Sequence, residues 1–215
     1  MYAIIGEDNS DVATLKVLVK RIAKTPNLSV MTKGYNGGPQ LLERGAAQLN
    51  AYRELGCNRF IICYDCDDEL PIDRYKKIVD RVINKSDLKN SNPNESICAL
   101  VPVQEIESWI LADLSAVGKI ISSWRPTACF PNPEGQESPK EELAKLSRNM
   151  QRKPLYNHVV HNPRVAEHLK LDVLATKCPS SLPLFEVVLG HGGNVPQRPP
   201  HDHKDRLRKV LKALG

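Results

Sequence analysis

The chain of 215 residues carries a formal net charge of +5, and 41% of its residues are hydrophobic, which is enough to bury the core of one domain without disulfides. No stretch approaches the roughly 18 uninterrupted apolar residues of a membrane span, and the first residues turn acidic before the apolar core of a signal peptide could form. We therefore exclude a membrane protein and expect a cytoplasmic one whose six cysteines are reduced thiols.

Short apolar strands alternate with amphipathic helices through the first half of the chain. Apolar runs of the strand type occupy residues 2–7, 28–32, 59–64 and 96–103. Helical spacing of apolar residues follows the first three strands, with Ser10 as the N-cap of the first helix and later helices over 39–55 and 71–83. This alternation predicts an α/β fold with a four-stranded parallel sheet flanked by helices.

Acidic residues follow three of these four strands. Parallel strands end at the same edge of a sheet, where the ligands of such folds gather, so these acids are expected to lie together. Two of them, Glu7 and Asp11, are four residues apart at the start of the first helix, and we expect its amino end to keep both ionised. The six candidates are Glu7, Asp11, Asp65, Asp67, Glu105 and Glu107.

A cluster of carboxylates without paired His or Cys indicates Mg²⁺ or Mn²⁺ rather than zinc. Such ions polarise phosphoryl oxygens and lower the pKa of a bound water, so the site suits phosphodiester chemistry. Cys63 and Cys66 have C-x-x-C spacing, but no second pair accompanies them. We interpret these thiols, and the histidines of "HVVH" (158–161) and "HDH" (201–203), as packing or surface residues.

The sequence changes character after residue 117. Residues 118–139 are rich in Pro, Ser and Gly and predict a surface loop or insertion. Helical patterns resume beyond it, at 141–150, 163–171, 182–189 and 204–214. We therefore divide the chain into a catalytic α/β domain (1–117), the loop (118–139) and a small helical C-terminal extension (140–215).

The end of the chain is basic, since residues 198–215 hold six Lys or Arg and two Asp. Such a segment beside an acidic centre is typical of proteins that bind polyanions. The candidates for phosphate contacts are Arg206, Arg208, Lys209 and Lys212. Alternatively the apolar residues of this helix pack against the domain or a partner and leave a solvated basic face, and we favour this packing. These apolar residues are Leu207, Val210, Leu211 and Leu214.

Two sets of motifs resemble known families. "GEDNSD" after the first strand and "YDCDD" after the third resemble the Toprim domain of topoisomerases, primases and overcoming-lysogenisation-defect nucleases, over residues 1 to about 115. "PVQEIESWILAD" and "YNHVVHNPRVAEHLKLDVLATKCPS" look like a small bacterial Toprim-like family associated with ATPases and phage defence, which extends the resemblance to about residue 189.

The resemblance implies roles for the candidate acids. It makes Glu7 a metal ligand or general base, and it makes Asp65 and Asp67 ligands of Mg²⁺. Asp11, with Glu105 or Glu107, would complete a second metal site. The chain lacks the large domain that supplies a nucleophilic Tyr in topoisomerases, so water is the expected nucleophile. A catalytic Lys, found in some of these nucleases, is left open among Lys140, Lys153 and Lys177.

We thus expect a Toprim-like, Mg²⁺- or Mn²⁺-dependent nuclease that acts on DNA or RNA, as an effector of antiviral defence with an ATPase partner. The alternative is a non-catalytic Mg²⁺-binding module that binds nucleic acid or regulates an ATPase, and a homo-oligomer is left open. A receiver domain with Asp65 as phosphoryl acceptor would need a hydroxyl and a Lys after later strands, where acids stand instead. Trp109 is predicted to be a core anchor rather than a base-stacking residue.

Overall fold

The strands of the protein form a four-stranded, all-parallel sheet, as the sequence predicts, and their order in the sheet is β2-β1-β3-β4. The computed structural model describes residues 1–90, 92, 94–148, 154–190 and 203–215. The strands are β1 (Tyr2–Gly6), β2 (Val30–Gly34), β3 (Arg59–Cys63) and β4 (Ser96–Leu100). The α/β fold class with a helical C-terminal end is therefore confirmed.

Two strand boundaries differ from the prediction. Strand β2 begins at Val30 and continues through Gly34 rather than ending at Thr32. A Cβ at Gly34 would lie 2.4 Å from the backbone of Asp8, so only glycine lets the chain pass at this point. Strand β4 ends at Leu100 rather than Val103, because Pro102 has no N–H to donate to the ladder.

One face of the sheet is covered by α2 (Gly38–Glu54), α3 (Pro71–Ile78) and the π-helix η1 (Val79–Ile83), which share one hydrophobic cluster with it. The sequence predicts a single helix over 71–83, but the backbone changes from α to π geometry at Val79. A 3₁₀ turn, η2 (Asp87–Asn90), follows. The crossover helices thus lie where right-handed βαβ units place them.

The other face of the sheet is covered by α1 (Asn9–Ile22) and by α9 (Leu182–Leu189), which comes from the far end of the chain. Buried residues of α1, β4 and α9 belong to one hydrophobic cluster, which also contains residues of the helices between β4 and α9. The helical C-terminal part therefore supplies part of the core of the sheet.

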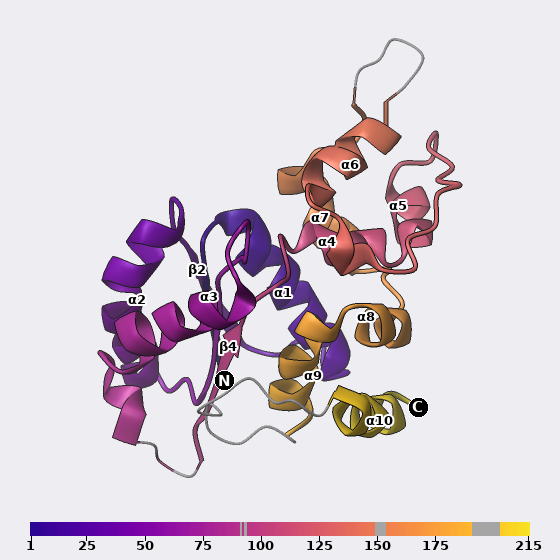
Figure 1. Ribbon diagram of the computed structural model, residues 1–215. Coiled ribbons are helices and arrows are strands. Elements are labelled where there is room, and N and C mark those ends of the chain that lie inside the picture. Colours follow the sequence, from indigo (N-terminus) through magenta and orange to yellow (C-terminus); the bar gives the residue numbers. More distant parts are fainter. Residues whose placement is uncertain (91, 93, 149–153, 191–202) are drawn as a thin grey trace.

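The helices between β4 and α9 are α4 (Glu107–Leu111), α5 (Leu114–Ile120), η3 (Pro133–Gly135), α6 (Pro139–Leu146), α7 (His158–Ala166), α8 (Leu171–Lys177) and η4 (Pro179–Ser181). Of these, α4 to α7 lie towards the carboxyl ends of the strands, with α7 packed on α1, and α8 lies beside α9 and the C-terminal helix (Figure 1). Trp109 on α4 is 1% exposed, and its Nε1 donates to Ser180 Oγ at 2.9 Å. Its predicted place in the core is confirmed.

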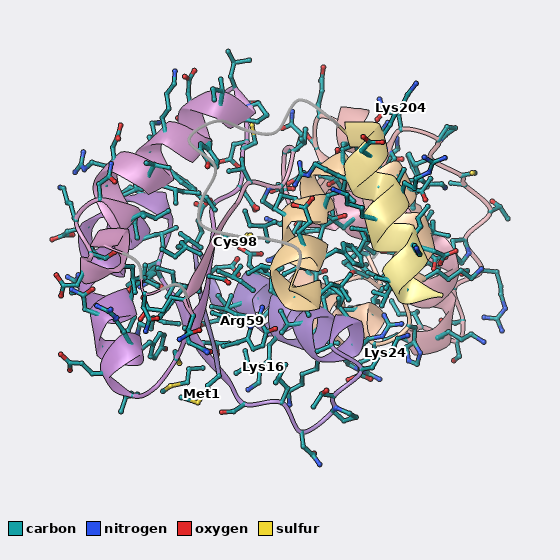
Figure 2. The ribbon with its side chains drawn as sticks, turned by 90° about the horizontal axis from the view of Figure 1, so that it is seen from below. Met1, Lys16, Lys24, Arg59, Cys98 and Lys204 are labelled. Atoms are coloured by element: carbon teal, nitrogen blue, oxygen red, sulfur yellow. The ribbon has the colours of Figure 1, made fainter. Side chains whose placement is uncertain are left out.

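The basic helix α10 (His203–Leu214) packs against α8 and α9. Val210 is fully buried, while Leu211 is 37% exposed and does not take the packing role predicted for it. Arg206 makes two hydrogen bonds of 2.5 and 2.6 Å to the Glu186 carboxylate of α9. Figure 2 shows Lys24 beside the end of α10, where its Nζ donates to the Leu214 carbonyl at 3.4 Å.

Two further expectations concern the whole chain. Each of the six cysteines lies within the described residues and is a free thiol, as expected. None of the helices that the structure describes is long and apolar enough to cross a bilayer. Three residues considered above lie outside the described part of the chain: Lys153, Arg198 and His201. The side chain of His203 also lies outside it.

Candidate functional site

The amino end of α1 is fixed by Asp8 and not by Ser10, so the predicted N-cap is wrong by two residues. The backbone of Asp8 is extended (φ −139°), and its carboxylate accepts from the N–H groups of Ser10 (2.6 Å) and Asp11 (2.9 Å). This is the hydrogen bonding of an acidic N-cap. Ser10 instead lies in the first turn, and its buried hydroxyl has no hydrogen-bond partner among the described residues. The cap places Asp11 in the same turn, where it is 5% exposed.

Glu7 and Asp65 join the ends of the two central strands. Glu7 follows β1 and Asp65 follows β3, and the Asp65 N–H donates to Glu7 Oε1 at 2.8 Å. Strand β1 lies between β2 and β3. The chain therefore goes from β1 to its neighbour on one side, β2, and then returns to its neighbour on the other side, β3. Such a switch point is where open parallel sheets bind ligands, at the carboxyl ends of the strands.

The carboxylates of Asp65 and Asp11 are poorly compensated. Asp65 Oδ1 is buried and accepts no hydrogen bond from any described group. Burial raises the pKa of Asp65 well above its usual range, and the charges of Asp11, Glu107 and Glu7 raise it further. Burial, with Asp8 and Glu107, does the same for the pKa of Asp11. Desolvation and like charges thus oppose the ionisation of Glu7 and Asp11 that the helix amino end was expected to favour.

Glu7 and Glu107 also hold protons more tightly than exposed carboxyl groups. Burial is the main reason that the pKa of Glu7 rises to about 7, against the lowering effect of the Asp65 N–H. Burial likewise raises the pKa of Glu107 to about 7, although Lys140 and Asn162 favour its charged form. The site thus holds four electrostatically interacting carboxyl groups: Glu7, Asp11, Asp65 and Glu107.

Lys140, at the start of α6, is the cation of this site. Its Nζ lies 3.0 Å from Glu105 Oε1, and its backbone N–H donates to the same carboxylate at 3.3 Å. Burial alone would lower the pKa of Lys140, but Glu107 and Glu105 raise it above its usual value. Among the predicted lysines, Lys177 instead donates to the Ala112 carbonyl at 3.1 Å.

Asn162 and Tyr156 hold Glu107 in place, and the sequence does not reveal this role. Asn162 is fully buried on α7, and its Nδ2 donates to Glu107 Oε1 at 3.0 Å. The Tyr156 hydroxyl donates in turn to Asn162 Oδ1 at 2.7 Å. Both residues stand in "YNHVVHNPRV", the motif that extends the family resemblance. The motif therefore marks these residues, but it does not show that Asn162 binds Glu107.

Asp67 lies at the rim of the site. Its side chain is 51% exposed, and its Oδ2 lies 2.9 Å from Arg74 Nη2. Arg74 is nearly buried and stacks over the Tyr64 ring at 4.3 Å. Burial slightly outweighs Arg74, so the pKa of Asp67 is raised. The charge of Asp67 is near enough to raise the pKa of Glu7, but the Asp67 carboxylate itself pairs with Arg74.

Within the described residues, no group of three or more His, Cys, Asp or Glu is arranged so that it could hold a metal ion. Uncompensated carboxylates repel one another, so a metal site here requires rotation of some of these side chains. The donor set itself consists of hard oxygens, which suit Mg²⁺ and Mn²⁺. A large surface cavity of about 840 Å³ lies next to these acids, between β2 and α2, and none of the six candidates lines it.

The comparisons with known proteins identify one family. Residues 7–188 match the model of a family described as a domain of unknown function, DUF4276. No curated protein and no solved structure matches the chain. The match begins at Glu7, directly after β1, and ends at Val188 within α9, so it includes each of the six candidate acids.

Proposed function

The chain belongs to the DUF4276 family, and we propose from its site that it is a metal-dependent hydrolase of phosphodiester bonds in DNA or RNA. One observation carries the proposal. Asp65 Oδ1 is buried and accepts no hydrogen bond in the part of the chain that the structure describes, and the charges of neighbouring carboxylates raise the pKa of Asp65. A buried, ionised carboxylate destabilises the fold unless it is protonated or paired with a cation. A divalent cation would satisfy the oxygen and lower the repulsion.

The donor types present fit a divalent ion of the magnesium type once some of these side chains rotate. Asp11 and Asp65 would hold it, with Glu107 beside them, because a cation would compensate the like charges that raise the pKa of both aspartates. Asp67 would join this set only after leaving Arg74. When bound, such an ion polarises a phosphoryl oxygen and lowers the pKa of a water molecule.

The protein's own groups can move the protons that hydrolysis requires. Glu7 has a pKa of about 7, so it is partly ionised near neutral pH and suited to accept a proton from the attacking water. The water oxygen bonds to phosphorus as the bond to the leaving oxygen breaks. Lys140 has a raised pKa, so it acts as a fixed positive charge that stabilises the leaving oxygen, which takes its proton from solvent.

A second function rests on a different observation. Glu105 and Glu107, one of which would complete a second metal site, are already engaged by Lys140 and Asn162. A site left with a single ion at Asp11 and Asp65 favours a module that binds Mg²⁺ and nucleic acid, or regulates an ATPase, without cleaving. The association with an ATPase and with phage defence is proposed for both functions on the family resemblance alone.

Incubation with plasmid, single-stranded DNA and total RNA tests the proposal. We expect cleavage in Mg²⁺ or Mn²⁺ that EDTA abolishes and that Asp65→Asn removes. Asp73→Asn is the matched control, because Asp73 is an exposed acid that pairs with Lys76 outside the site. Metal that raises the melting temperature without any cleavage would select the binding module. Neither cleavage nor a metal effect would refute both functions.

A further inference from the structure

A polar groove lies beside the edge strand of the sheet, next to the acidic site. It has a volume of about 840 Å³ and lies between β2 and α2. Its lining includes two cations and several amides, namely Lys33, Arg44, Asn36, Gln40 and Gln48. Glu43 is the one acid among its lining residues. A concave surface of this composition is suited to an anionic ligand.

The two cations of the groove gather around Tyr35. Lys33 Nζ lies 5.9 Å from the centroid of the Tyr35 ring. Burial raises the pKa of Tyr35, and the charge of Arg44 opposes this rise, so Arg44 is also close. Lys33 and Arg44 are exposed, and neither forms an ion pair with a carboxylate of the described residues. Both charges are therefore available to a ligand.

The groove is continuous with the edge of the sheet that carries the acids. Asn9 and Gly34 line its end, and a Cβ at Gly34 would lie 2.4 Å from the backbone of Asp8. The loop that separates the groove from the site is held on β1, because the Gly37 N–H donates to the Glu7 carbonyl at 3.0 Å. A chain molecule lying in the groove would reach Glu7 across this short loop.

We propose that the groove binds the phosphodiester backbone of a single nucleic-acid strand, and so guides that strand into the acidic site. The inference rests on the proposed hydrolase function and names the form of its substrate. The groove follows α2 from Gln40 to Ala51, roughly 16 Å at the rise of an α-helix, which is long enough for several backbone units. Cations and amides bind phosphate and sugar oxygens without reading the bases.

A pair of neutral substitutions tests the groove. Lys33→Gln with Arg44→Gln removes both charges, and Lys85→Gln with Lys119→Gln is the control, since these lysines are exposed and do not line the groove. Binding of a labelled oligothymidylate is measured in EDTA at several salt concentrations. We expect the groove variant to bind about tenfold more weakly at low salt, with a salt-dependence slope smaller by about 1.4, as for two lost phosphate contacts to a single strand. The control variant should bind like the wild type, and both should melt at the wild-type temperature.

The outcomes separate this inference from the proposed function. Equal affinities and slopes for wild type and groove variant would overturn the inference, even if the wild type cleaves. A wild type that never cleaves, but whose binding depends on Lys33 and Arg44, would overturn the hydrolase and leave the groove. A groove variant that loses only binding to polyglutamate would show that the groove receives an acidic peptide instead.

Discussion

The backbone N–H of Asp65 donates to Glu7 Oε1 across 2.8 Å, from the end of β3 to the end of β1. This bond orients the Glu7 carboxylate, but the Asp65 carboxylate gains nothing from it. Asp65 Oδ1 stays buried and accepts no hydrogen bond from the residues that the structure describes. One acid of the pair is thus positioned by the backbone, while the charge of the other is poorly compensated among the remaining carboxylates.

Replacing Asp65 should stabilise the metal-free protein. Asp65→Asn removes a carboxylate that burial and four neighbouring acids disfavour, so we expect the free energy of unfolding to rise by about 1 kcal/mol near pH 8. Urea denaturation in EDTA measures this. Mg²⁺ should raise the melting temperature of the wild type but not of the variant. A variant less stable than the wild type would show that Asp65 supports the fold, and would count against a site that lacks a cation.

Stability without metal should fall as the pH rises through the range from about 4.5 to about 7. The pKa of Glu107 is 4.5 in its ordinary state and about 7 in the fold, so between these values the native state binds more protons than the unfolded state. Stability then decreases with rising pH, by on the order of 3 kcal/mol for this group. Denaturation in EDTA at about pH 5 and about pH 8 measures the loss.

Glu107→Gln is the control for this pH dependence, because it keeps the side-chain volume and removes the titration. We expect its stability curve to be flatter than that of the wild type over the same range. Saturating Mg²⁺ should flatten the wild-type curve as well, since the cation replaces the protons. Equal pH dependence in all three cases would show that Glu107 titrates normally.

Lys140 should matter more at high pH than at low pH. The charge of Lys140 stabilises the ionised form of Glu107 and adds little to stability when Glu107 is protonated. Lys140 also pairs with Glu105 at 3.0 Å. Lys140→Met keeps the aliphatic packing and removes the charge. We expect a loss of about 1 to 3 kcal/mol near pH 8 and a smaller loss near pH 5, both measured by denaturation. Lys145→Met, on the same helix, tests the effect of removing an exposed lysine, and a pH-independent loss at Lys140 would contradict the assignment.

How far the sequence predicts this site depends on which contacts build it. Apolar strands and their parallel order predict that Glu7, Asp11 and Asp65 meet at one edge, because sheet geometry alone determines that arrangement. The contacts of Lys140 and Asn162 depend instead on how α6 and α7 pack, and no local pattern encodes the packing of distant helices. The cap at Asp8 was missed for a local reason, since Asp8 and Ser10 are both good N-caps.

Trp109 should contribute to stability and not to nucleic-acid binding. It is 1% exposed within the core and donates a hydrogen bond to Ser180. Trp109→Ala should therefore lower the free energy of unfolding by roughly 3 to 5 kcal/mol. Ser180→Ala should cost about 1 kcal/mol by removing the hydroxyl that accepts from the indole N–H and donates to Glu134. Denaturation measures both, and a stable Trp109→Ala protein with weakened oligonucleotide binding would reverse the assignment to the core.

The basic helix α10 should act through packing rather than through phosphate contacts. Val210 is buried and Arg206 is bound to Glu186 of α9, so Arg206→Gln should lower stability by about 1 to 3 kcal/mol. The exposed cations Arg208, Lys209 and Lys212 lie on the other side of the molecule from α2 and its groove (Figure 1). Changing all three to Gln should leave the melting temperature and the salt dependence of oligonucleotide binding unchanged. If instead the slope of the salt dependence falls by about 2, as expected for three lost contacts to a single strand, the tail takes part in binding the substrate, and the path of the nucleic acid must extend beyond the groove.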